Sequence, residues 1–440
     1  MNLRDTLRIN EAGHLEIGGA DTVDLVKRFG TPLYALDYAY IANVASAFVS
    51  ALRDNYGEGA VAFASKAFCS AAVYKLISGL GLYADTVSKG EMYTAFSGKM
   101  LPERIILHGN NKQAYEIDYA VENGAGYIVL DAGHEAAAVD AAAKKHGKIQ
   151  RVLVRVNPGV EAHTHRFVQT ARADSKFGFS IADGCADAFI KSVFNYPNLE
   201  FCGVHCHIGS QIFDEEAYGL AIDVMTDYIK RLGGLYGIAV KVLNLGGGFG
   251  VHYTEKDPYY TAENYAEYVV FIAEKLKESA RKKDIAKPFL IIEPGRSLIA
   301  EAGITLYTVG AVKDIKGIKK YYAVDGGMFE NPRYVMYRSE YSAIVANRAT
   351  EPFAETVSLT GKCCESGDMI AVDIPLQRAD RGDIIAVFST GAYNYSMSSR
   401  YNGNLRPPVV MVKNGQAEYI VKPETYDDLI RHDIIPNFLK

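Results

Sequence analysis

Three side chains of this sequence could do chemistry together, and each lies at the end of a short apolar run. Lys66 offers an amine, His207 an imidazole and Glu293 a carboxylate. An amine can attack a carbonyl group, while an imidazole and a carboxylate can hold or transfer protons. A single lysine in such a place is commonly a strand-end residue whose ammonium reaches solvent. The interpretation therefore depends on whether the fold brings the three groups together.

A glycine-rich stretch adds a possible anion site. Gly246-Gly247-Gly248-Phe249-Gly250 follows an apolar run, and consecutive glycines let backbone N–H groups close around an anion such as a phosphate. No Gly-Lys-Ser/Thr follows, which excludes a Walker loop, and the spacing is not that of a dinucleotide fold. Pro294-Gly295-Arg296 directly follows Glu293 and offers further backbone donors.

The elements that would position these groups form a regular alternation of apolar runs and helical segments. The expected strands are Val61–Lys66, Leu82–Val87, Arg104–Gly109, Tyr127–Asp131, Val152–Asn157, Gly203–Ile208, Val242–Leu245 and Leu290–Glu293. The clearest helices are Ala39–Tyr56, Ala114–Asn123, His134–His146 and Ala262–Arg281, the last with Thr261 as its N-cap. Eight such units predict an α/β fold, a (β/α)8 TIM-type barrel, in preference to an open doubly wound sheet.

In a barrel, all strands end at one rim, where active sites lie. The polar residues expected at this rim are Lys66, Asp85, His108, Asn110, Asp131, Arg155, Asn157, His207, Glu293 and Arg296. Any one of them could be an ordinary polar strand end, and Asp85, His108 and Arg155 have no assigned role beyond lining the site. The whole set on one rim indicates an enzyme. The glycine stretch follows strand seven and Glu293 ends strand eight, where barrels commonly bind phosphate.

The pattern changes near residue 304. The segments Ile304–Val312, Tyr321–Val324, Thr356–Thr360, Asp383–Phe388 and Val409–Val412 read as strands with short turns and few helices. We therefore expect three parts: an N-terminal segment (1–36), a barrel (37–302) and a C-terminal β-sandwich or β-barrel domain (303–440). The N-terminal segment precedes the first barrel strand, so we expect it to join the C-terminal β domain.

Composition narrows the partners and the compartment. The net charge is −5 with no basic block, which argues against nucleic acid and against anionic membrane surfaces. No apolar run reaches the roughly 18 residues of a membrane span. The six cysteines fit no zinc-ribbon spacing and include the adjacent pair Cys363-Cys364. His163 and His165 lack a third ligand at plausible spacing, so we expect no metal, and we expect a cytoplasmic protein.

One cofactor would use an amine, a phosphate cradle, a carboxylate and an imidazole together, and that cofactor is pyridoxal 5'-phosphate. Lys66 would bind its aldehyde, and Glu293 would keep its ring nitrogen protonated so that the ring withdraws electrons. His207 could stack on the face of the ring.

Several motifs also carry a resemblance to a known family. They are Phe63-Ala64-Ser65-Lys66-Ala67, His108-Gly109-Asn110-Asn111-Lys112, His207-Ile208-Gly209-Ser210-Gln211, Gly246–Gly250, Glu293-Pro294-Gly295-Arg296, Asp325-Gly326-Gly327-Met328, Cys364-Glu365-Ser366-Gly367-Asp368 and Gly391-Ala392-Tyr393-Asn394-Tyr395-Ser396. In this order, over about residues 30–415, they resemble the fold-type III pyridoxal-phosphate-dependent decarboxylases, most closely the diaminopimelate decarboxylase family.

The resemblance implies a role for each matching position. Lys66 would carry the cofactor, His207 would face its ring, and Glu293 would contact its ring nitrogen. The phosphate would be held by Ser210, Gly246, Gly247, Gly248, Pro294, Gly295, Arg296 and Tyr393. The substrate would be held by Arg296, Arg333, Tyr337, Glu365 and Tyr393. A homodimer is implied, with Cys364 and Glu365 entering the site from the partner subunit and Cys364 donating a proton.

The resemblance further implies a carboxy-lyase that converts meso-2,6-diaminopimelate to L-lysine and CO2, the last step of lysine biosynthesis. Arg296 and Arg333 suit the distal carboxylate of this substrate, and Glu365 suits its ammonium.

Three alternatives remain. One is a decarboxylase of carboxynorspermidine, ornithine or arginine with the same fold, although two arginines in the substrate site disfavour it. Another is an enzyme like alanine racemase, which would place an arginine rather than Glu293 near the ring nitrogen. The last is a non-catalytic pyridoxal-phosphate-binding protein, commonly a lone barrel.

Overall fold

The computed structural model describes residues 3, 7–159 and 175–440, and these form two compact units. The β unit comprises Met1–Ile41, His252–Asp257 and Ile299–Lys440, and the barrel unit comprises Ala42–Val251 and Pro258–Leu298. The N-terminal segment thus belongs with the C-terminal β domain, as expected.

Eight parallel strands close the barrel. They are β5 (Gly59–Ala64), β6 (Tyr83–Thr86), β7 (Ile105–Leu107), β8 (Tyr127–Leu130), β9 (Gln150–Asn157), β11 (Leu199–His205), β12 (Val242–Asn244) and β13 (Phe289–Ile292). Each pairs with its neighbour in chain order, and closure comes from the pairing of β13 with β5. The two-residue strand β10 (Phe179–Ser180) adds to β9 outside this ring. All eight expected strands are present, which confirms the predicted barrel.

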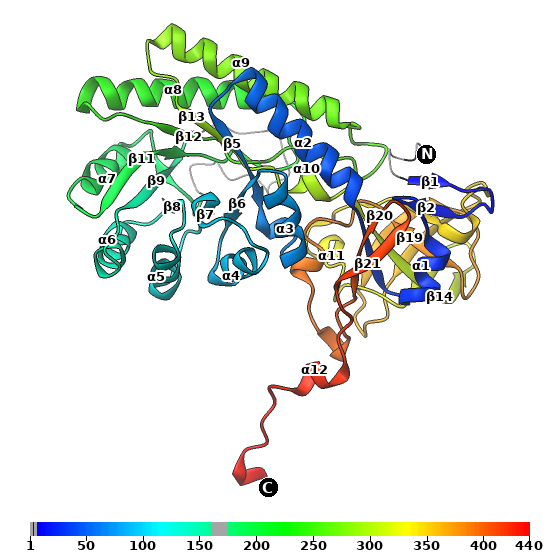
Figure 1. Ribbon diagram of the computed structural model, residues 1–440. Helices are drawn as coiled ribbons and strands as arrows, with labels where there is room; N and C mark the ends of the chain where they lie inside the picture. Colours follow the sequence, from blue (N-terminus) through cyan, green and yellow to red (C-terminus); the bar gives the residue numbers. More distant parts are fainter. Residues whose placement is uncertain (1–2, 4–6, 160–174) are drawn as a thin grey trace. The chain divides into compact units, whose positions relative to one another are not determined.

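Helices surround the strands on the outside, as Figure 1 shows. They are α2 (Tyr38–Asn55, which begins in the β unit), α3 (Ala71–Gly79), α4 (Lys89–Ser97), α5 (Ala114–Asn123), α6 (Glu135–Lys145), α7 (Cys185–Val193), α8 (Glu216–Tyr236), α9 (Ala262–Lys283) and the short α10 (Arg296–Ile299). Helix α5 has the predicted bounds, and Thr261 caps α9 by accepting the Asn264 N–H. Among the described residues, no helix is long and apolar enough to span a membrane.

The first barrel strand begins and ends two residues earlier in the chain than predicted. Strand β5 ends at Ala64, and Ser65–Ala67 form a 3-10 turn, so Lys66 lies two residues beyond the strand. The side chains from Ala60 to Ala64 are buried, because a parallel strand in a barrel is covered on both faces. Lys66 leaves this covered stretch and is exposed.

The β unit is built around a nine-stranded sheet. Its strands are β4 (Leu33–Asp37), β14 (Gly303–Ile315), β15 (Lys319–Val324), β16 (Ala343–Val345), β17 (Glu355–Thr360), β18 (Met369–Leu376), β19 (Ile384–Val387), β20 (Val409–Lys413) and β21 (Gln416–Val421). The unit also holds α11 (Arg333–Tyr337), α12 (Tyr426–Ile430), α1 (Thr22–Phe29) and a small sheet of β1 (Leu7–Ile9), β2 (Leu15–Ile17) and β3 (Ala20–Asp21).

Strand β4 joins the N-terminal segment to this sheet. It pairs antiparallel with β14 on one side and parallel with β20 on the other. Residues from the small sheet and α1, including Leu15 and Leu25, share one apolar core with Ile304 and Val410. The predominantly β second domain is therefore confirmed, with the N-terminal segment built into it.

A buried ion pair fixes the loop that follows β7. The Nζ atom of Lys112 lies 2.8 Å from Oε2 of Glu135 and donates to the Gly109 carbonyl at 2.7 Å. Both charged side chains are almost completely buried, at 1% and 0% exposure. The Glu135 carboxylate also accepts the N–H groups of Lys112 and Asp131. This loop begins at His108, so the ion pair holds a rim residue in place.

We predict that Lys112→Met destabilises the protein by about 3–5 kcal/mol, because it leaves the Glu135 carboxylate buried without its cation. Urea unfolding followed by circular dichroism measures the effect. The matched control is Lys145→Met, which removes an exposed pair with Asp118 and should cost less than about 1 kcal/mol. Equal losses in the two variants would contradict the assigned importance of the buried pair.

Candidate active site

Four neighbouring strands carry the predicted cofactor residues at their carboxyl ends. Around the barrel these strands follow one another as β11, β12, β13 and β5. The predicted residues that follow them are His207, Ser210, Gly246, Gly247, Gly248, Glu293, Pro294, Gly295, Arg296 and Lys66. Because the strands are parallel, the structure brings all of these residues to one part of the rim.

The glycines after β12 lie where no side chain fits. A Cβ atom on Gly247 would lie 2.0 Å from the Glu293 carbonyl oxygen. One on Gly248, which has a φ of +126°, would lie 2.5 Å from the Gly209 carbonyl oxygen. The backbone of this loop can therefore approach a bound group closely, as a phosphate cradle requires.

A buried guanidinium lies at the same part of the rim. Nη2 of Arg296 donates to Oγ of Ser210 at 2.9 Å, and Arg296 is 8% exposed. The preceding Gly295 is packed closely, since a Cβ there would lie 2.8 Å from the Cβ of Ala64. The Ala64 N–H in turn donates to the Pro294 carbonyl, which ties the β13 loop to the end of β5. A guanidinium beside a hydroxyl is a donor set that suits a phosphate or a carboxylate.

His207 is held as a neutral ring. Its Nδ1 atom accepts the Gly247 N–H at 3.2 Å, so its ring proton lies on Nε2. Burial and the nearby Lys66 charge hold the pKa of His207 well below its usual value. A neutral, oriented imidazole can present its face to a planar ligand.

Glu293 lies at the centre of a buried polar cluster contributed by four further barrel strands or their loops. Its Oε1 accepts from Nδ2 of Asn244 at 2.6 Å and lies 2.8 Å from Nε2 of His108. Its Oε2 lies 3.4 Å from Nε2 of His205. The same Nε2 atom of His108 also lies 3.7 Å from Oδ1 of Asp85. Glu293 is 6% exposed, so these groups replace water around its carboxylate.

The electrostatics of the cluster favour the ionised form of Glu293. Burial alone would raise the pKa of Glu293, but His108 and His205 outweigh it, and the pKa lies well below its usual value. Burial opposes the charge of His108, yet Glu293 and Asp85 raise its pKa overall. Burial lowers the pKa of His205 to about 3 despite Glu293, so this ring is neutral at physiological pH.

Lys66 acts electrostatically on the same rim. Its charge favours the ionised form of Asp85 and the neutral form of His207, although Lys66 is exposed. Arg155 is a further cation on this rim, and its Nη1 atom lies 3.8 Å from Oδ2 of Asp131. An accessible amine beside a polar rim can react with a carbonyl ligand.

The predicted substrate residues Arg333, Tyr337 and Tyr393 come together in the β unit. The Cζ atom of Arg333 lies 5.5 Å from the ring centre of Tyr337 and 5.1 Å from that of Tyr393. Its Nη2 donates to Oγ of Ser339 at 3.2 Å. Arg333 is 7% exposed, so its guanidinium is held by the aromatic rings rather than by water.

Cys364 and Glu365 lie on an exposed loop between β17 and β18 of the β unit. Asp368 anchors this loop by accepting the N–H groups of Cys363 at 2.7 Å and of Met328 at 2.6 Å. The Cys364 N–H donates to Oδ1 of Asn402 at 2.9 Å. The Cys364 thiol is free and exposed, so it is available to a partner.

Comparison with known proteins agrees with this geometry. Residues 42–300 match the sequence model of the pyridoxal-dependent decarboxylases, pyridoxal binding domain. The chain belongs to this family.

Full-length relatives make the relationship more specific. The chain is 46% identical to the diaminopimelate decarboxylase of Bacillus subtilis (strain 168), over 99% of the chain and 98% of the relative. It is 41% identical to the one of Staphylococcus aureus (strain COL), over 97% and 99%. The structure of diaminopimelate decarboxylase from M. jannaschii in co-complex with L-lysine superposes with a TM-score of 0.91 and 33% identity, over 99% of both chains. A lysine/ornithine decarboxylase from Vibrio vulnificus, at 22% identity and a TM-score of 0.74, shares the fold.

The decarboxylase cofactor fits the residues of this chain. Because the glycine loop carries no Cβ atoms at Gly247 and Gly248, its backbone can approach a ligand closely. Arg296 and Ser210 offer hydrogen-bond donors for a phosphate. Glu293 offers a carboxylate for a ring nitrogen, and Lys66 offers an amine for the aldehyde. Pyridoxal 5'-phosphate needs these four features.

Sequence reasoning missed two members of the Glu293 cluster, His205 and Asn244. His205 is the last residue of β11, and His207 lies two residues beyond the strand. Asn244 ends β12, which is the strand next to β13. A polar residue at a strand end was the local signal for both, whereas their contact with Glu293 depends on the strand order.

One group of described residues has the spacing of a metal site. Ligand atoms of His108, His205 and Glu293 lie within 4.8 Å of one another. Nε2 of His108 lies 2.8 Å from Oε1 of Glu293, and the nearby carboxylates raise the pKa of His108, which favours a pair of an imidazolium and a carboxylate here. His163 and His165, the residues considered in the sequence for a metal, lie outside the described part of the chain.

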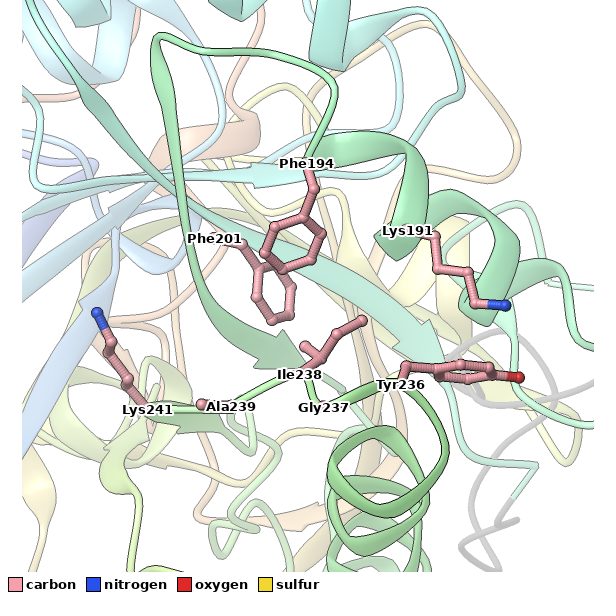
Figure 2. Close-up of a pocket in the computed structure, with 8 residues that line it drawn as sticks. All are labelled: Lys191, Phe194, Phe201, Tyr236, Gly237, Ile238, Ala239 and Lys241. Atoms are coloured by element: carbon pink, nitrogen blue, oxygen red, sulfur yellow. The ribbon is translucent and has the colours of Figure 1, made fainter.

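A hollow in the surface of the barrel unit lies at the amino-terminal ends of the strands. Figure 2 shows its lining of Lys191, Phe194, Phe201, Tyr236, Gly237, Ile238, Ala239 and Lys241. Phe201 lies near the start of β11, and Lys241 directly precedes β12. The amino-terminal face of such a barrel usually contributes to stability rather than catalysis. The hollow is therefore separate from the decarboxylase site.

We predict that Gly247→Ala abolishes retention of pyridoxal phosphate, because the new Cβ would displace the loop from the Glu293 carbonyl. Cofactor retention is measured by absorbance after gel filtration, and folding by circular dichroism. Gly234→Ala is the control, since nothing lies within 4 Å of its Cβ in helix α8. It should keep the cofactor and gain up to about 1 kcal/mol of stability. Full retention by Gly247→Ala would contradict the cradle.

Proposed function

We propose that this protein catalyses the decarboxylation of meso-2,6-diaminopimelate to L-lysine and CO2 with pyridoxal 5'-phosphate, the last step of lysine biosynthesis. The observation that carries the proposal is the 46% identity to the diaminopimelate decarboxylase of Bacillus subtilis (strain 168) along 99% of the chain. The clustered lysine, carboxylate, imidazole and glycine loop support the same chemistry.

Three residues of the barrel unit act on the cofactor in this proposal. Bound pyridoxal phosphate supplies an aldehyde that condenses with amines and a ring that accepts the electrons released as CO2 leaves. Lys66 would hold the aldehyde through its amine. Glu293, as a carboxylate, would accept a hydrogen bond from the ring nitrogen. His207 would face the ring and fix its plane.

The phosphate is held at the glycine loop. The backbone of Gly246, Gly247 and Gly248 approaches it, together with Ser210 and the Pro294-Gly295-Arg296 turn. We assign Tyr393 to the same phosphate because its motif resembles that of the decarboxylase family. The close packing of these glycines makes the cradle rigid, so the phosphate fixes the position of the cofactor.

Substrate recognition rests on the distal amino-acid group of diaminopimelate. Arg296 and Arg333 bind its carboxylate, and Tyr337 and Tyr393 position the Arg333 guanidinium. Glu365 binds the distal ammonium. Ornithine and arginine have no distal carboxylate, so a site with two arginines selects against them.

The proposal includes a homodimer in the cytoplasm. Cys364 and Glu365 enter the site of the partner subunit, and the Cys364 thiol donates the proton that replaces the lost carboxylate. Their position on an exposed, anchored loop supports this contribution. The six free cysteines suit a reducing compartment.

The first test is the absorbance spectrum of the purified protein, followed by addition of meso-diaminopimelate while CO2 and lysine are measured. A visible cofactor band that changes with substrate, together with lysine formation, supports the proposal. A band without turnover would shift the substrate to another diamino acid. No band after addition of pyridoxal phosphate would contradict the proposal as a whole.

We predict that Arg333→Ala lowers kcat/KM for meso-diaminopimelate about 100-fold, since a charge-assisted hydrogen bond contributes about 1.5–3 kcal/mol. The cofactor spectrum should remain unchanged. Arg338→Ala removes an exposed arginine five residues away and should retain activity. Unchanged kinetics in Arg333→Ala would contradict the substrate assignment.

We further predict that mixing Lys66→Ala and Cys364→Ala subunits restores activity that neither variant has alone. In a mixed dimer, one site would combine an intact Lys66 with an intact Cys364 from the other chain. Turnover is measured after the subunits have exchanged. The absence of restored activity in proven mixed dimers would show that Cys364 does not act across the interface.

A further inference from the structure

The cluster around Glu293 contains two histidines whose surroundings differ. Two carboxylates approach Nε2 of His108, Glu293 at 2.8 Å and Asp85 at 3.7 Å. His205 lies 3.4 Å from Glu293, and its ring centre lies 4.8 Å from that of His108. Two imidazolium ions this close would repel each other, so the cluster favours one charge, on His108.

The charges of the neighbouring groups point to the same assignment. Two carboxylates raise the pKa of His108 against burial, while burial lowers the pKa of His205 to about 3. Arg155 disfavours a proton on either ring. His108 therefore acts on Glu293 as a cation, and His205 acts only as a neutral contact.

The charge on His108 influences whether a proton shared by Glu293 and the cofactor lies on the carboxylate or on the ring nitrogen. A buried carboxyl group prefers its neutral form unless a cation or a donor stabilises the anion. If Glu293 faces the ring nitrogen of the cofactor, the two groups compete for one proton. A cation on the other side of Glu293 lowers the proton affinity of the carboxylate and leaves the proton on nitrogen.

We propose that His108 is a positioning residue that keeps Glu293 as a carboxylate, so that the proton it shares with the cofactor remains on the ring nitrogen. This rests on the proposed function, because it takes pyridoxal phosphate as the bound group. Asp85 adds a second negative charge near the same Nε2 atom of His108. His205 fills the space beside Oε2 of Glu293 and contributes no charge.

The backbone around His108 is held firmly enough for this role. Its N–H donates to the Thr86 carbonyl at 2.7 Å, next to Asp85 on β6. Four residues later, the buried pair of Lys112 with Glu135 anchors the other end of the loop. The imidazole is thus fixed against Glu293 before any ligand binds.

The decisive experiment compares His108→Gln with His205→Gln, each loaded with pyridoxal phosphate that carries 15N at the ring nitrogen. The 15N chemical shift reports whether this nitrogen carries a proton. Glutamine keeps a hydrogen-bond donor and removes the charge.

We expect His108→Gln to bind the cofactor and to shift the ring nitrogen toward its unprotonated form. We also expect it to lose activity roughly 10- to 100-fold, as is typical when an orienting partner is removed. In His205→Gln, the ring nitrogen should stay protonated.

A protonated ring nitrogen in His108→Gln, in an otherwise active wild-type enzyme, would overturn this inference and leave the proposed function intact. Equal shifts in the two variants would also overturn it, because packing alone would then explain the effect. A wild-type protein that neither binds the cofactor nor releases CO2 would instead refute the proposed function.

A second measurement needs no variant and covers the case in which His108→Gln does not fold. Wild-type protein labelled with 15N in its histidines should show that His108 keeps both ring nitrogens protonated to a higher pH than a free histidine does, while His205 is neutral. A neutral His108 would overturn the proposal.

Discussion

The burial of the Glu293 carboxylate is the constraint on which the site depends. A carboxylate that is 6% exposed loses most of its hydration, and such a loss costs several kcal/mol unless partners replace the water. Asn244 and His108 replace it at 2.6 and 2.8 Å, and His205 lies close to the second oxygen. These residues are far apart in the chain, and they meet only because the barrel closes. The stability of the closed barrel and the charge state of the site are thus linked.

The opposite requirement holds at the glycine loop, where the site is formed by the absence of side chains. At Gly247 and Gly248, a Cβ would overlap the carbonyl oxygens of the neighbouring strand ends. The same four adjacent strands, β11, β12, β13 and β5, are therefore followed both by charged side chains and by a glycine loop that leaves space for a ligand. An elongated cofactor with a phosphate at one end and a ring nitrogen at the other requires this combination.

The β unit follows a separate physical principle. Strand β4, from the N-terminal segment, lies between β14 and β20, so the sheet cannot be completed until nearly the whole chain is available. Within this unit, Asp368 ties the Cys364 loop to Met328, while aromatic rings hold Arg333. The predicted substrate residues are thus fixed by short local contacts inside a sheet that is formed by distant segments.

The sequence by itself was sufficient for the eight barrel strands, the bounds of helix α5 and the N-cap of α9, because these depend on local apolar runs, periodicity and capping. It also indicated Lys66, His207, Glu293 and the glycine loop as one site. Strands β1 to β3, β10, β16, β18 and β21 were missed, since brief runs and runs that mix polar with apolar residues carry little periodic signal. Only the tertiary structure decided that His108, His205 and Asn244 surround Glu293. Strand order and barrel closure set those distances, and contacts between residues this far apart in the chain leave no mark in any local pattern.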